Sequence, residues 1–155
     1  MKSVSHWATA LATALVLATG ATSALAHSDA PHPDTLKAAN GGQLGVAGSS
    51  SYELVVVRDA KEAKESPVLV YVTDHAGKKL PTAGASGTAM ILAGKIKASV
   101  TLQPDGDNRM KGLAKYAASP DMKVVVSITL AGQQPEQTRF TPLAVAKDGH
   151  TDHTH

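Results

Sequence analysis

The sequence predicts an all-β domain, an antiparallel β-sandwich of the immunoglobulin-like type with about seven to eight short strands. Apolar and polar residues alternate along 95–102 and 122–130, so each segment can bury one face and expose the other. Turn-rich segments at 81–84, 104–107 and 119–121 separate candidate strands. No stretch shows sustained helical periodicity. A small barrel is the alternative architecture.

The candidate strands differ in composition. Residues 52–58 and 68–73 are rich in valine on both faces, as expected near the centre of a sheet. Pro142 limits the last strand to a sheet edge or a strand end. Residues 59–65 are compatible with a single helical turn. Strands are expected at residues 43–47, 52–58, 68–73, 88–93, 95–102, 110–116, 122–130 and 138–145.

Residues 1–26 have the pattern of a secretory signal peptide. Lys2 begins a short basic region, residues 8–19 are apolar, and Ala24 and Ala26 form a small-x-small cleavage site. The apolar run is too short to span a membrane. We therefore expect cleavage after Ala26, a periplasmic location and no membrane segment in the mature chain.

The mature chain is expected to contain one domain. Residues 43–146 hold the strand pattern and suffice for a single core. Residues 27–42 and 147–155 contain few large apolar residues, so burial cannot offset the entropy cost of ordering them. We expect both terminal segments to be flexible.

Composition excludes several classes of protein. The net charge is only +2 and the basic residues are dispersed, so nucleic acid is not an expected partner. The chain has no cysteine, which excludes disulfides and thiolate metal sites and leaves histidine, methionine, carboxylate and amine ligands. Catalytic motifs such as His-Glu-x-x-His and Gly-x-Ser-x-Gly are absent, so we do not expect an enzyme.

Histidines are concentrated at the two ends of the mature chain. Cleavage after Ala26 would make His27 the N-terminal residue, whose amine and imidazole can chelate Cu(II) together. In the tail, three imidazoles and a carboxylate within six residues can supply most of a metal coordination shell. These segments are candidate copper or zinc sites, either separate or shared, with ligands His27, His32, His150, Asp152, His153 and His155.

Two other residue types within the domain are potential ligands. His75 follows Asp74 at the end of a valine-rich strand, where it is either a metal ligand or part of a polar turn, and the turn is the commoner case. Met90, Met110 and Met122 lie within predicted strands, which favours core packing over Cu(I) binding. Residues 105–108 faintly resemble a calcium loop, but a tight hairpin turn explains them better.

Several separated motifs across residues 40–141 resemble a family of small exported bacterial proteins often found with heavy-metal or copper efflux systems. The resemblance implies a periplasmic β domain with a connection to metal homeostasis, without an assigned activity. Family members often have His-Gly-Gly where this chain has Asn40, Gly41 and Gly42, whereas His75 agrees with the pattern. The motifs are Asn40-Gly41-Gly42-Gln43, Tyr52-Glu53-Leu54-Val55, Val70-Tyr71-Val72-Thr73-Asp74-His75, Pro81-Thr82-Ala83-Gly84, Gly106-Asp107-Asn108-Arg109-Met110 and Arg139-Phe140.

Two functions follow as hypotheses. The first is a periplasmic buffer or chaperone that binds copper or zinc through the terminal histidines, and that serves metal tolerance or a component of an efflux system. The second is a non-catalytic interaction module that binds a protein partner in the cell envelope, with the histidines incidental.

Overall fold

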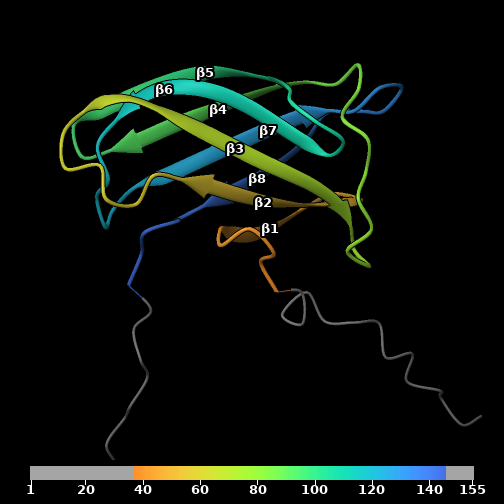
Figure 1. The fold of residues 1–155 in the computed structure, drawn as a ribbon, viewed down its shortest axis with the longest axis horizontal. Coiled ribbons are helices and arrows are strands. Elements are labelled where there is room, and N and C mark those ends of the chain that lie inside the picture. The colour runs from red at the N-terminus through yellow and green to blue at the C-terminus, as the bar shows by residue number, and fades with distance from the viewer. Residues whose placement is uncertain (1–36, 146–155) are drawn as a thin grey trace, which may run out of the picture.

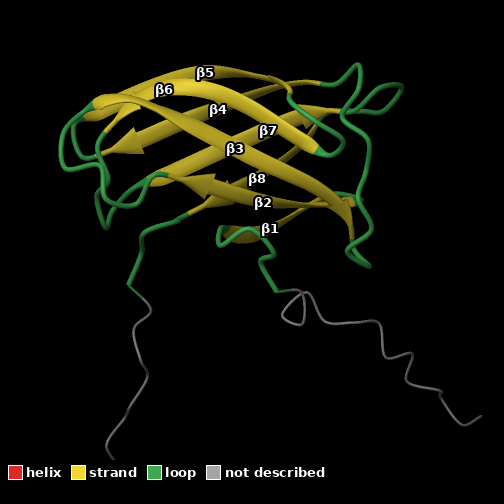
Figure 2. Ribbon diagram, in the orientation of Figure 1, coloured by secondary structure: helices red, strands yellow, loops and turns green. Residues whose placement is uncertain are grey.

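Eight antiparallel strands make up the part of the chain that the computed structural model describes, residues 37–145 (Figure 1). Strands joined by loops, without helices, account for this part (Figure 2). The prediction of an all-β antiparallel domain is confirmed. The strands are β1 (Gln43–Ala47), β2 (Ser50–Val56), β3 (Lys64–Asp74), β4 (Ser86–Ala93), β5 (Ile96–Pro104), β6 (Arg109–Tyr116), β7 (Lys123–Thr129) and β8 (Glu136–Phe140).

The observed strands lie close to the expected ones, with differences at their ends. β3 begins at Lys64, and the preceding residues 59–63 are irregular rather than a helical turn. β8 ends at Phe140, two residues before Pro142, because proline cannot donate a ladder hydrogen bond. It also starts at Glu136, earlier than expected, where it pairs with Ile128 of β7.

The strands form one sheet in the order β1-β2-β3-β6-β5-β4-β7-β8. β4, β5 and β6 follow one another as hairpins, while β3 lies beside β6 and β7 lies beside β4. The β3–β4 connection places β3 beside β6, and the β6–β7 connection places β7 beside β4, so the three hairpin strands belong to two overlapping Greek keys. The connectivity differs from the immunoglobulin order, in which the second and third strands lie in opposite sheets, because here β2 pairs directly with β3.

The sheet bends sharply between β5 and β6 and nearly closes on itself. The β5–β6 ladder is restricted to the pairs Gln103–Lys111 and Pro104–Met110 beside the turn, whereas β3 and β6 pair along eight residues. The two edge strands, β1 and β8, come together on the other side of the molecule (Figure 1). The inward-facing side chains of the sheet form one continuous core.

Burial alternates along the strands as the period of two predicts. Val124, Val126 and Ile128 of β7 are buried. Met110 and Met122 are also buried, as expected, but the expectation of core packing for Met90 is wrong, because its exposure is 41%. β4 is apolar in both phases, and Ala89, Ile91 and Ala93 occupy its inner face instead.

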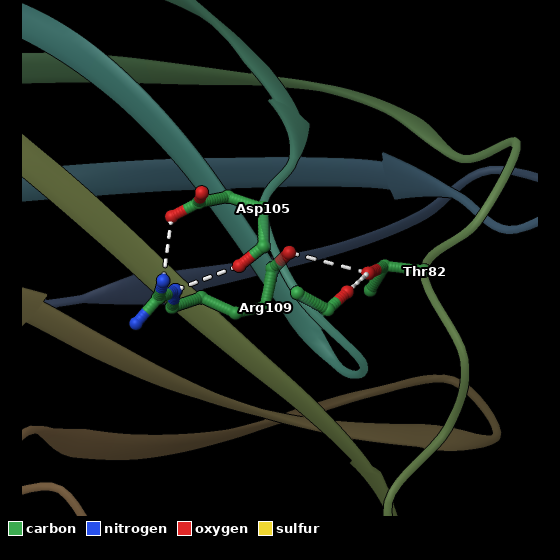
Figure 3. Close-up of polar contacts among 4 residues, drawn as sticks. Thr82, Asp105 and Arg109 are labelled. Atoms are coloured by element: carbon green, nitrogen blue, oxygen red, sulfur yellow. Dashed lines mark hydrogen bonds and ion pairs between the residues drawn. The ribbon is translucent and has the colours of Figure 1, made fainter.

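The turn predicted at residues 105–108 joins β5 to β6 and is fastened to the loop before β4 (Figure 3). Arg109 binds Asp105 through a salt bridge of 2.8 Å and donates from Nε to the Asp105 carbonyl. The buried Thr82 donates its N–H to the Asp107 carbonyl, and its hydroxyl lies 3.2 Å from the carbonyl oxygens of Gly106 and Arg109. These contacts fix one end of the domain.

Gly112 permits the close approach of β5 and β6 at the bend. A Cβ atom at this position would lie 2.7 Å from the Thr101 carbonyl oxygen and 2.7 Å from Val100 Cγ2. We predict that Gly112→Ala lowers the free energy of unfolding by about 1–3 kcal/mol through overpacking. Urea denaturation measures the loss, with the exposed neighbour Lys111→Ala as the control. Equal stability of the two variants would contradict this account of the bend.

Candidate functional site

A buried carboxylate holds the segment that precedes β1. Glu53 points outward from β2 yet has an exposure of only 5%, because residues 39–42 cover it. Its Oε1 accepts hydrogen bonds from the N–H groups of Asn40 (2.7 Å) and Gly42 (2.9 Å). Its Oε2 accepts from the N–H of Ala39 (3.1 Å) and from Nδ2 of Asn40 (2.9 Å). We call residues 39–42 the anchor loop.

The anchor loop is tied to β2 through four hydrogen bonds to one carboxylate, and hydrogen bonds to a charged group are stronger than those between neutral groups. It borders a pocket of about 300 Å³ on the outer face of the sheet. Each Glu53 oxygen already accepts two hydrogen bonds, so the carboxylate fixes the loop rather than offering a free cation ligand. Polar residues lining the pocket include Lys37, Asn40, Glu53, Tyr71, Thr73, Lys79 and Asn108.

The two ends of the described chain are joined where β1 meets β8. The N–H of Thr141 donates to Oε1 of Gln43 across 2.8 Å. The buried ring of Phe140 packs against Gly45, where a Cβ atom would lie 2.9 Å from the ring. We call this contact, formed by Gln43, Gly45, Phe140 and Thr141, the β1–β8 seam. It places Gln43 and Thr141, each within a few residues of an end of the described chain, beside each other.

At the other end of β1, Glu136 of β8 holds the β1–β2 turn. Its Oε1 accepts hydrogen bonds from the N–H and the hydroxyl of Ser49, both 2.7 Å long. Partial burial raises the pKa of Glu136, but these hydrogen bonds to the charged form outweigh it, so the pKa lies below its ordinary value. Burial, and then the charge of Glu136, raise the pKa of Tyr52, which therefore stays a neutral core phenol.

His75 reaches the same turn from the opposite side. Its Nε2 lies 3.0 Å from the Gly48 carbonyl oxygen, and its Nδ1 lies 3.2 Å from the Ser51 hydroxyl. A carbonyl only accepts, so Nε2 carries the proton. Asp74 closes a second turn, the one that follows β3, by accepting hydrogen bonds from the N–H groups of Ala76 and Lys78. Because both ring nitrogens have partners, this geometry supports the turn role, and metal binding by His75 would break one contact.

The structure thus describes one of the seven predicted metal ligands. His27, His32, His150, Asp152, His153 and His155 lie outside the described residues. Among residues 37–145, no three His, Asp or Glu side chains are grouped to hold a metal ion. His75 is separated from Gln43 by the length of β1, about 17 Å.

The sequence pattern did not predict the residues that organise the two ends of the described chain: Glu53, Gln43, Glu136 and Thr141. The glycine pair after Asn40 indicated a tight turn, which was the available signal for the anchor loop. Glu53 itself lies in a valine-rich strand, where a carboxylate carries no periodic signal.

Comparison of the chain with protein-family models, with curated proteins and with solved structures finds no match. The resemblance of residues 40–141 to exported proteins associated with metal efflux therefore stays a prediction. Across residues 37–145, no helix has the length and apolar character needed to cross a membrane.

We predict that Glu53→Gln frees the anchor loop. The side-chain amide would present N–H groups to backbone N–H donors, which costs about 2 kcal/mol of unfolding free energy. Hydrogen exchange at the amides of Ala39, Asn40 and Gly42 should accelerate at the same time. The control is Glu65→Gln, an exposed carboxylate on β3. Unchanged exchange at these three amides would refute the anchor role.

We predict that protonation of Glu136 in acid removes its stabilising contribution to the domain. Because its folded pKa is lowered, its contribution is complete above the ordinary glutamate pKa of about 4.3 and is lost as the pH falls through the lower folded value. Glu136→Gln should therefore cost about 1 kcal/mol at neutral pH and progressively less as the pH falls below the ordinary glutamate pKa. Urea denaturation from about pH 7 to pH 3 tests this, and a pH-independent difference would exclude the charge as its cause.

Proposed function

We propose that the protein is an exported, non-catalytic metal binder that buffers or carries Cu(II) or Zn(II) for a heavy-metal tolerance or efflux system. The observation that supports this proposal is the hydrogen bond between Gln43 and Thr141. It brings together the two positions from which the histidine-bearing segments extend.

The chain lengths on either side of this bond allow one ion to contact both segments. His32 lies seven residues before Ala39, the first residue of the anchor loop, and His150 lies six residues after Ala144, whose N–H donates to the Thr141 carbonyl. At about 3.3 Å per residue, these stretches can span about 23 Å and 20 Å. Two ligand groups tethered this closely have a high effective concentration for each other. Binding by one group therefore favours binding by the other.

The described domain supplies the frame for these ligands rather than the ligands themselves. Glu53 and Glu136 are each committed to loop N–H groups, and both His75 nitrogens are occupied. The proposed donors are imidazoles, the N-terminal amine and carboxylate outside residues 37–145. Imidazole and amine nitrogens suit Cu(II), and imidazole with carboxylate suits Zn(II).

We predict one tight equivalent of Cu(II) or Zn(II) per mature chain in calorimetric titration. Removing either cluster, with His27→Ala and His32→Ala or with His150→Ala, His153→Ala and His155→Ala, should weaken binding at least about tenfold because chelation is lost. Affinity should also fall below about pH 6 as the imidazoles protonate.

The control is Lys147→Ala with Asp148→Ala, which alters the tail and retains every histidine. Two independent equivalents would refute sharing of one ion. Binding no stronger than that of a free peptide with the tail sequence would refute the proposed function. Mass spectrometry of the exported protein establishes whether His27 is the N-terminal residue.

A further inference from the structure

The outer face of β4, β7 and β8 carries an apolar strip between cationic side chains. Met90 and Leu92 of β4 have exposures of 41% and 42%, although they lie in the middle of the sheet. Met90 pairs directly with Val125 of β7, so their side chains share this face. A groove of about 320 Å³ lies at the Leu92 end of the strip, lined in part by Leu92 and Val125.

Cations flank the strip in fixed register. Leu92 pairs with Lys97 of β5 on one side and with Lys123 of β7 on the other. Val125 pairs in turn with Arg139 of β8. Directly opposed residues have Cβ atoms about 5 Å apart, so each cation lies next to an apolar side chain.

Carboxylates are missing from this face of the described strands. Its other strand positions are serine, threonine and glutamine, while the exposed Asp121, in the turn before β7, is close enough to interact with the charge of Lys123. The one salt bridge within residues 37–145, Arg109–Asp105, lies at a different place in the fold. The three cations outnumber this nearby carboxylate, so the field around the exposed apolar strip is positive.

We propose that this face, which we call the cationic face, binds an extended segment of a partner protein with aliphatic side chains between carboxylates. The aliphatic groups would fill the groove over Leu92 and Val125, and the carboxylates would pair with Lys123, Arg139 and Lys97. Charge complementarity selects an acidic partner, and the spacing of about 5 Å between strands suits an extended chain. This inference does not depend on the proposed metal function.

The test uses ¹⁵N-labelled protein and an acetylated, amidated hexapeptide of sequence Glu-Ser-Val-Ser-Glu-Ser, whose glutamate and valine side chains share one face when the peptide is extended. Amide shifts should be confined to β4, β7, β8 and the Lys97 end of β5, with binding that weakens as salt is added. Lys123→Glu with Arg139→Glu should weaken binding at least about tenfold, since two attractions become repulsions. Leu92→Ser should weaken it without changing the salt dependence.

The matched control is Lys111→Glu with Lys115→Glu, which makes the same charge change on exposed β6 positions and should leave binding within about twofold. Peptides with lysine for glutamate, or serine for valine, should not bind. The proposal is overturned if the shifts are absent or scattered, if the control variant weakens binding equally, or if only vesicles of anionic lipid bind. Dispersed spectra establish that each variant is folded.

Discussion

Contact between β1 and β8 is the constraint on which the arrangement depends. A domain without cysteine has no disulfide to close it, and an open sheet would leave two unpaired edges exposed. Here the edges meet through Gln43, Gly45, Phe140 and Thr141 rather than through a backbone ladder. Because Gly45 has no side chain, the Phe140 ring can pack directly against the β1 backbone. Closure of the sheet therefore depends on the pairing of a large residue with glycine.

Carboxylates reinforce this closure at both ends of β1. Glu53 fixes the loop that leads into β1, and Glu136 fixes the turn that follows it. Each accepts backbone N–H groups that have no strand partner, which is the task of a capping residue. Such carboxylates stabilise the frame of the domain at both ends of β1.

Local pattern predicted the strands well and their partners poorly. The alternation in β5 and β7 identified the buried faces, and the proline and glycine turns identified the hairpins. A period of two does not specify which distant strand is the neighbour, so the pairing of β3 with β6 and the meeting of Gln43 with Thr141 were not predictable. Where both phases are apolar, as in β4, the pattern also fails to choose between Met90 and Ile91. The environment of Glu53 depends on a loop that crosses it, which leaves no periodic trace.

The seam also has a consequence for folding kinetics. Gln43 and Thr141 are 98 residues apart, whereas the hairpins β1–β2, β4–β5 and β5–β6 join neighbouring segments. Loop closure over such a separation loses more chain entropy than hairpin formation, so we expect the seam to form late. Contacts that form after the transition state mainly govern the unfolding rate. We therefore expect the contacts of the seam to govern mainly the unfolding rate of the domain.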